Sequence, residues 1–205
     1  MPTLIVSSNH PKAVESAIEL LNHGGLVAFP TDTVYGLGAM LSDPQAIDQL
    51  FIAKGREADK AIAVLLGSLE QLPQVASEMS PMARRLAQVF WPGPLTLVVA
   101  RHPDLPANLS PNPTVGVRMP DHPAALTLLN LAGPLAVTSA NLSGQPSTCT
   151  AQEVYAQLAG RVPLILDGGP TPGGTPSTVV DCTRAEPLIL RPGQISRDQI
   201  WAAVN

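Results

Sequence analysis

Residues 115–144 have the sequence VGVRMPDHPAALTLLNLAGPLAVTSANLSG, and they determine the fold class that we expect. The short apolar runs at 115–119 and 135–138 are typical of buried strands. Between them, residues 123–131 begin with a proline, which can open a helix. Strands separated by helices favour parallel crossover connections. This stretch therefore predicts an α/β protein.

The same alternation of strands and helices continues on both sides of this stretch. Further helices are expected where a proline or a capping box can open them, at Pro11, Pro44, Pro81, Thr150 and Ser196. Further strands are expected at the apolar runs 4–6, 26–29, 61–66, 95–100, 164–167, 178–182 and 188–191. Strands that follow each other directly near the end of the chain favour an antiparallel part. We therefore predict a single domain over residues 1–205, with an open mixed parallel and antiparallel sheet and flanking helices.

Composition excludes several classes of protein. With 45% apolar and only 14% charged residues, the chain can build an aliphatic core and is not a charge-rich disordered segment. The net charge of −4 argues against nucleic-acid binding through a broadly basic surface, but it does not exclude a local basic site. The N-terminal sequence is unlike a signal peptide, and no apolar run reaches the length of a membrane span. Cys149 and Cys182 form no metal-ligand pattern. We therefore expect a soluble cytoplasmic protein.

Polar residues follow the strand expected at 26–29. Residues 29–38 have the sequence FPTDTVYGLG, in which Thr31 is the first of several hydroxyl side chains before two glycines. Backbone amides and hydroxyls at a strand end can hold a small polar ligand. A tight turn with an Asp-capped loop is the alternative interpretation.

A group of cations follows the helix that Pro44 opens. Lys54 and Arg56 are separated by one residue, and Lys60 follows them. Arginine offers a fork for a carboxylate or phosphate, whereas lysine acts as a point charge. Cations at a helix C-terminus are also favoured by the helix dipole, so a solvated helix end is the alternative.

Small polar residues also follow the strand at 135–138. Thr138, Ser139 and Asn141 lie in the sequence TSANLSG, and such side chains can contact phosphates, an amine or a metal-bound water. An Asx-turn or a helix cap is the alternative. No G-x-S-x-G frame surrounds Ser139, so this is not a nucleophile elbow.

A glycine-rich segment and two arginines complete the candidates. Residues 167–178, DGGPTPGGTPST, can close over a ligand, or they can form a long surface loop. Arg118 and Arg191 stand at the ends of apolar strands, where a guanidinium either projects from the sheet as a binding group or is simply solvated. The sequence contains no phosphate-binding glycine loop, no H-E-x-x-H motif and no paired-cysteine metal site.

Taken together, these motifs resemble the YrdC-like family of threonylcarbamoyl-AMP synthases. Eight segments match in family order and cover nearly the whole chain: 29–38, 54–56, 91–96, 117–120, 138–144, 167–169, 177–181 and 190–193. The resemblance implies a twisted open α/β sheet with a concave, locally positive active site. It also implies the short, single-domain form of the family.

The resemblance implies a reaction as well. L-Threonine, bicarbonate or CO2, and ATP would give threonylcarbamoyl-AMP and pyrophosphate. The product would then serve threonylcarbamoyladenosine formation at adenosine 37 of certain tRNAs, through a separate transferase complex. ATP would be a substrate, Mg2+ would be carried with its phosphates, and no resident metal site on the protein is expected.

The family's site residues can be carried over by position. Its basic and Ser/Asn tetrad falls on Lys54, Arg56, Ser139 and Asn141. The resemblance assigns the threonine to Thr31, Arg118, Ser139 and Ser177. It assigns the nucleotide, its phosphates or the carbamate to Lys54, Arg56, Thr138, Asn141, Ser147 and Arg191.

The chain departs from the family pattern at one position, and two other functions are alternatives to the synthase. Many family members have proline after the Lys-x-Arg pair, whereas this chain has Glu57, whose carboxylate lowers the local positive potential unless Lys60 pairs with it. An RNA-binding module that uses the same basic concave surface is the alternative function, for which tight tRNA binding with a steep salt dependence and no ATP turnover would speak. A carbamoyl-transfer domain of hydrogenase maturation is a third possibility, but zinc-finger cysteines are lacking.

Overall fold

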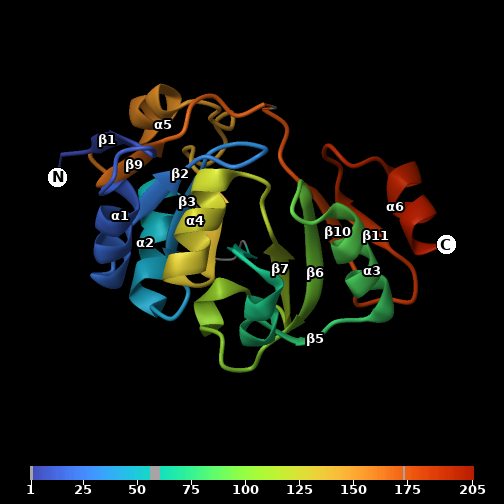
Figure 1. Cartoon of the computed structure of the whole chain (residues 1–205). Helices are drawn as coiled ribbons and strands as arrows, with labels where there is room; N and C mark the ends of the chain where they lie inside the picture. Colours follow the sequence, from blue (N-terminus) through green and yellow to red (C-terminus); the bar gives the residue numbers. More distant parts are fainter. Residues whose placement is uncertain (1, 56–60, 173) are drawn as a thin grey trace.

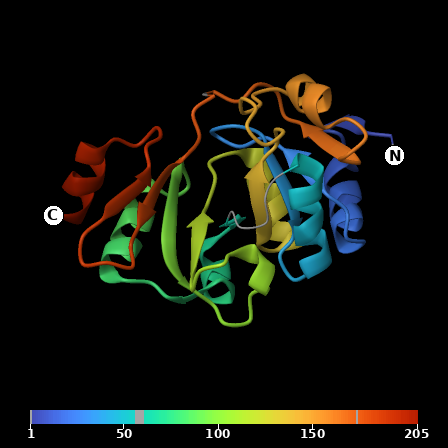
Figure 2. The same cartoon turned by 180° about the vertical axis from the view of Figure 1, so that it is seen from behind.

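A computed structural model of the chain describes residues 2–55, 61–172 and 174–205. Over these residues the chain forms one mixed sheet with helices packed against it, and the two termini lie at opposite ends of the molecule (Figure 1). The view from behind shows the same arrangement, with α2 now on the near side (Figure 2). The predicted fold class, an open mixed α/β sheet with flanking helices, is confirmed.

The elements follow the predicted order closely. The strands are β1 (Leu4–Ser7), β2 (Val27–Phe29), β3 (Gly36–Met40), β4 (Ala63–Leu65), β5 (Ala76–Glu78), β6 (Leu95–Arg101), β7 (Thr114–Arg118), β8 (Leu135–Ser139), β9 (Leu164–Asp167), β10 (Thr178–Asp181) and β11 (Leu188–Arg191). The α-helices are α1 (Ala13–Asn22), α2 (Pro44–Lys54), α3 (Pro81–Phe90), α4 (Pro123–Ala132), α5 (Ala151–Leu158) and α6 (Arg197–Val204). Two 3-10 helices, η1 (Leu69–Gln74) and η2 (Ala107–Leu109), lie in the connections.

The caps explain where several helices begin. The side chain of Asp43 accepts hydrogen bonds from the first amides of α2, so the helix starts at Pro44. Ser196 and Gln199 form the predicted capping box of α6. At α5, Thr150 accepts from the amide of Glu153 as expected, but the Glu153 carboxylate bonds to the amide of Cys149. The capping box predicted there is therefore only half formed.

The strand order of the sheet is β1-β9-β2-β3-β8-β4-β7-β6-β10-β11, and β5 pairs with β6 beside this path. The predicted parallel crossover is present from β1 through α1 to β2, since both strands run parallel to β9. The parallel crossover predicted from β7 through α4 to β8 is wrong. Strand β4 pairs parallel with β7 but antiparallel with β8, so β7 and β8 run in opposite directions. Alternating apolar residues suit either strand direction, so the sequence pattern could not decide this pairing.

Strand β3 was not predicted from the sequence, although it lies at the centre of the left half of the sheet in Figure 1. Its sequence is GLGAM, and glycine weakens the strand signal. A Cβ atom at Gly36 would lie 2.9 Å from Cγ1 of Val137, and one at Gly38 would lie 2.9 Å from Cε1 of Phe29. The glycines are therefore required by close packing, which only the tertiary structure reveals. The short strand β5 was missed as well.

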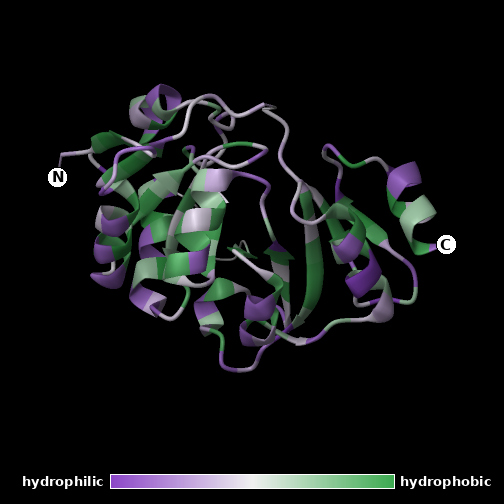
Figure 3. Ribbon diagram, in the orientation of Figure 1, coloured by the Kyte–Doolittle hydropathy of each residue, from purple (hydrophilic) through white to green (hydrophobic). Residues whose placement is uncertain are grey.

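Two hydrophobic cores hold the helices to the sheet. Helices α1 and α4 lie side by side on one face and pack against Phe29, Leu135, Val137, Leu164 and Leu166 (Figure 1). Helices α2, α3, α5 and α6 contribute to a larger core on the other face of the sheet. Strand residues that alternate with those of the first core, such as Ala136, Val64 and Val117, belong to it. Figure 3 shows the hydrophobic residues concentrated in the strands, with hydrophilic residues on the outer sides of the helices.

The register of the strands decides which side chains share the face of α1 and α4. Leu65 of β4 stands opposite both Leu135 of β8 and Arg118 of β7. The side chain of Arg118 therefore lies on the same face of the sheet as α1 and α4, which cover that face over other strands. Over β4, β6, β7 and β10, this face lines a cavity instead. No helix in the described ranges is long and apolar enough to span a membrane.

Candidate active site

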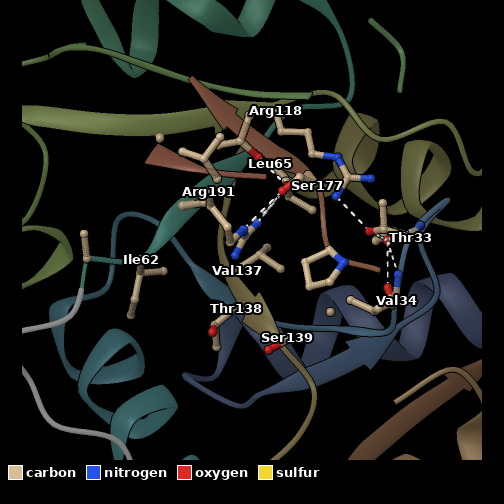
Figure 4. A pocket seen from close by; sticks show the side chains of 18 of the residues that line it. Thr33, Val34, Ile62, Leu65, Arg118, Val137, Thr138, Ser139, Ser177 and Arg191 are labelled. Carbon is tan, nitrogen blue, oxygen red and sulfur yellow. Dashed lines mark hydrogen bonds between the residues drawn. The ribbon is translucent and has the colours of Figure 1, made fainter. Parts of the chain in front are cut away.

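A cavity of about 350 Å³ opens on this face of the sheet (Figure 4). Its floor is formed by residues of the central strands, including Leu65, Val98, Gly116 and Val137. Its polar groups come from the ends of strands and the turns beside them: Thr31, Thr33, Thr96, Arg118, Thr138, Ser139, Ser177 and Arg191. An apolar floor with a few converging polar groups is the usual form of a small-molecule site.

The buried guanidinium of Arg118 forms one wall of the cavity. Nη2 donates to the carboxylate of Asp32, Nη1 donates to Oγ1 of Thr33 at 3.0 Å, and Nε donates to the carbonyl of Gly93 at 3.0 Å. Burial lowers the pKa of Arg118, the charge of Asp32 opposes this effect, and the charge of Arg191 lowers the pKa further. Arg118 and Arg191 are therefore close enough to repel each other, which favours an anion between them.

Asp32 was not assigned a role from the sequence, although it lies in the motif at 29–38. Its Oδ1 accepts from Arg118 and from the amide of Asp121, at 3.1 Å in the second case. Its Oδ2 is buried and has no hydrogen-bond partner among the described residues. Asp32 therefore fixes Arg118 without itself lining the cavity. An acidic residue in a hydroxyl-rich turn was the available signal, but its partner is 86 positions away.

Thr31 organises the turn that leads into β3. Its hydroxyl donates to the carbonyl of Val34 at 2.7 Å and accepts from the amides of Thr33 and Val34 at 3.2 and 3.4 Å. The alternative interpretation of this motif, a tight turn, is therefore part of what the structure shows. The turn also carries Thr33 to Arg118, so it serves the cavity as well.

Arg191 and Ser177 form the opposite wall. Nε and Nη2 of Arg191 donate to the carbonyl of Ser177 at 3.1 and 2.8 Å, and Nη2 also lies 3.0 Å from Ser177 Oγ. Figure 4 shows the Arg191 guanidinium directed into the cavity between Ser177 and Val137. A Cβ atom at Gly193 would lie 2.3 Å from the amide nitrogen of Thr178, so the turn after Arg191 packs directly on this backbone.

Lys54 lies beneath the polar turn that follows β8. Its ammonium group donates to the carbonyl of Ser139 and, at 2.6 Å, to the carbonyl of Asn141, and its own carbonyl accepts from the amide of Ser143. Lys54 is buried, and it is not a solvated helix end. Its two hydrogen bonds stabilise the conformation of the Ser139–Asn141 turn, and its positive charge lies close to that turn.

The side chain of Asn141 also supports this turn. Its Nδ2 donates to the carbonyls of Leu142 and Gln145, both at 2.8 Å. Its Oδ1 is buried without a hydrogen-bond partner in the part of the chain that the structure describes.

Tyr35 joins the start of the glycine-rich segment to the sheet. Its hydroxyl donates to the carbonyl of Gly169 at 2.8 Å and lies 3.4 Å from Oδ1 of Asp167. Burial, followed by the negative charge of Asp167, raises the pKa of Tyr35 to about 12. The residue stays a neutral hydrogen-bond donor at physiological pH and was not assigned a role from the sequence.

The structure brings most of the predicted site residues together. Of those predicted, the cavity is lined by Thr31, Arg118, Thr138, Ser139, Ser177 and Arg191. Lys54 and Asn141 lie beside it as supports of the Ser139 turn. Ser147 is half-buried farther along the same loop and is not among the lining residues. Arg56 lies outside the described residues, as do Glu57 and Lys60.

The chemistry of the lining groups favours an anionic ligand. Two guanidinium groups face the cavity, and the remaining polar groups are hydroxyls and backbone amides that can orient a carboxylate, carbamate or phosphate. No cluster of three or more His, Cys, Asp or Glu side chains that could hold a metal ion occurs within the described ranges.

Comparison with known proteins identifies the family. A family model for Sua5, YciO and YrdC proteins, described as telomere recombination, matches residues 19–193. The chain is 43% identical to a threonylcarbamoyl-AMP synthase of Bacillus subtilis in an alignment of 206 positions that covers 98% of this chain and 58% of that protein. It is also 43% identical to a putative threonylcarbamoyl-AMP synthase of Mycobacterium tuberculosis, over 92% of this chain and 88% of that protein. The chain belongs to the Sua5/YciO/YrdC family.

A solved structure supports the same assignment. The fold superimposes on Pyrococcus abyssi Sua5 complexed with L-threonine with a TM-score of 0.94 and 40% sequence identity. The match covers 100% of this chain and 61% of the Sua5 chain. The chain thus spans about three fifths of the length of two of these relatives, from B. subtilis and P. abyssi.

Proposed function

We propose that this chain is an L-threonylcarbamoyladenylate synthase, a nucleotidyltransferase that makes threonylcarbamoyl-AMP and pyrophosphate from L-threonine, bicarbonate or CO2, and ATP. The observation that carries the proposal is the convergence of Arg118, Arg191 and the hydroxyls of Ser139 and Ser177 on one cavity. The curated names of relatives at 43% identity, and the threonine complex of P. abyssi Sua5, support this choice of substrates.

The chemistry needs charge neutralisation and positioning. The amine of threonine adds to CO2 and loses a proton to give a carbamate. A carbamate oxygen then forms a bond to the α-phosphorus of ATP, the bond from that phosphorus to the bridging oxygen breaks, and pyrophosphate leaves. Negative charge gathers on the carboxylate, the carbamate and the phosphates together, so fixed cations and hydroxyl donors stabilise the reacting arrangement.

We assign the polar groups of the cavity to different substrates. Arg118, with Ser177, Ser139 and the Thr31 turn, would hold threonine, because Asp32 fixes this guanidinium in place. Arg191 would neutralise the carbamate or a phosphate, together with Lys54 and Arg56. The turn that contains Thr138 and Asn141, with Ser147 beyond it, would lie near the nucleotide.

Mg2+ would enter with the ATP phosphates. The cavity is lined by hydroxyls and guanidinium groups, whereas Mg2+ bound by protein side chains usually takes carboxylates. This donor set fits an ion whose ligands come from phosphate oxygens and water. The ion would offset the charge of the leaving pyrophosphate.

The product would serve a further reaction in the cytoplasm. We propose that a separate transferase complex passes the threonylcarbamoyl group to adenosine 37 of tRNA. Direct tRNA binding by this chain is an accessory possibility, which a net charge of −4 does not favour as the main role.

A product assay tests the proposal. Pyrophosphate should be released from ATP only when L-threonine and bicarbonate are both present, and mass spectrometry should identify threonylcarbamoyl-AMP. Turnover that does not depend on threonine would contradict the proposal. Lys54→Ala and Asn141→Ala should abolish turnover, while circular dichroism shows that each variant is folded. Wild-type turnover in either folded variant would place the site elsewhere.

A further inference from the structure

Thr96 is a buried polar residue to which neither the sequence motifs nor the proposed reaction assigns a role. It lies in β6 between Leu95 and Leu97, which belong to the larger core, and it faces the opposite way, toward the cavity. Thr96 is 5% exposed and Ser177 is 4% exposed. Packing alone would accept a valine at this position, and a buried hydroxyl is costly unless it is hydrogen-bonded, so its partner indicates its role.

Within the described ranges, the hydrogen-bond partner of the Thr96 hydroxyl is Ser177. The two oxygens, Thr96 Oγ1 and Ser177 Oγ, are 2.8 Å apart. The pairing of the two strands sets the distance between these oxygens. Strand β10 runs parallel to β6, with Thr178 opposite Leu95, and the amide of Thr178 donates to the carbonyl of Pro94 at 3.0 Å. Thr96 therefore supports Ser177 from the floor of the cavity.

The same Ser177 oxygen is engaged by Arg191. A hydroxyl group has one proton and two lone pairs, and Nη2 of Arg191 at 3.0 Å occupies one lone pair. When Thr96 donates to the second lone pair, the proton of Ser177 remains for a group in the cavity. Thr96 and Arg191 together then make Ser177 a donor toward an anion.

We propose that Thr96 is a positioning residue that holds the Ser177 hydroxyl as a hydrogen-bond donor to the anionic carboxylate of the amino-acid substrate. The Thr96–Ser177–Arg191 relay joins β6 and β11 through the residue that directly precedes β10, the strand between them, at one edge of the cavity. The role rests on the proposed function, since the substrate is the L-threonine named there. Thr96 acts through Ser177, so its effect should disappear when Ser177 has no hydroxyl.

The test is a double-mutant cycle with Thr96→Val and Ser177→Ala. Thr96→Val keeps the shape of the side chain but removes the hydroxyl, and it should raise KM for L-threonine and the Kd measured by calorimetry about tenfold, with little change in kcat. Thr96→Ser should restore both constants to within about twofold of wild type. In the Ser177→Ala background, Thr96→Val should have almost no further effect, because the two residues act as one unit.

A control variant distinguishes the relay from the general effect of losing a strand hydroxyl. Thr114→Val removes a hydroxyl from β7 outside the cavity and should leave the Kd unchanged. Additive effects of Thr96→Val and Ser177→Ala, or equal losses in Thr96→Val and Thr96→Ser, would overturn the relay. So would threonine binding by Thr96→Val that equals that of the wild type, with the proposed function still standing. Failure of the wild type itself to bind L-threonine would overturn the proposed function and the relay with it.

Discussion

Removal of the Asp32 carboxylate should destabilise the protein strongly, because Arg118 would then carry a buried charge without a counter-ion. The Arg118 side chain is 7% exposed and that of Asp32 is 13% exposed. Breaking a buried ion pair by removing one partner typically costs about 3–5 kcal/mol. Thr33 and Gly93 still accept from Arg118, so we expect Asp32→Ala to lie near the lower end, at about 3 kcal/mol.

Companion variants test the cause of this loss. Asp32→Asn keeps an acceptor for Arg118 and for the amide of Asp121, and should cost less than Asp32→Ala. The double variant Asp32→Ala/Arg118→Met removes both charges and should be more stable than Asp32→Ala alone. Asp104→Ala, which removes a carboxylate with 89% exposure beside His102, is the matched control and should change stability by less than about 0.5 kcal/mol.

Equilibrium unfolding in urea measures these differences in the free energy of unfolding. The fluorescence of the two tryptophans reports the transition. A loss of less than about 1 kcal/mol in Asp32→Ala would refute the argument that Asp32 neutralises a buried Arg118. A double variant less stable than Asp32→Ala would refute it as well. Asp32→Ala should also bind L-threonine more weakly than the wild type, since Arg118 would no longer be held in place, whereas Asp104→Ala should bind it normally.

Two further predictions follow from raised pKa values. The pKa of Tyr35 is raised to about 12 from 10.0, so the neutral folded form is favoured, and the free energy of unfolding should fall as pH rises from about 10 to about 12. Tyr35→Phe should remove this part of the alkaline loss, as urea titrations across that range can show; identical slopes in the two proteins would contradict the assignment. Burial, followed by the charge of Asp181, raises the pKa of Cys182 to about 12. At about pH 8, a thiol reagent should therefore modify Cys149 quickly in the native protein and Cys182 only after denaturation, whereas two fast native thiols would count against this.

Local sequence determined much of the secondary structure. Apolar runs placed most of the strands, and the caps at Asp43, Ser80 and Ser196 begin helices where the sequence predicts them. These signals are local, because a strand or a cap depends on residues within a few positions of each other. The order of motifs along the chain was sufficient to indicate the family.

The tertiary structure decided the pairing of strands and the partners of the charged groups. The direction of β8 and the existence of β3 depend on neighbours far along the chain, and alternating or glycine-rich sequences do not encode them. The sequence indicated that Lys54, Arg118, Ser177 and Arg191 belong to a site. Only the fold shows that Lys54 holds carbonyls, that Asp32 holds Arg118, and that Ser177 links Arg191 to Thr96. A hydrogen bond or ion pair depends on distances of a few ångströms between residues dozens of positions apart, and those distances are set when the sheet assembles.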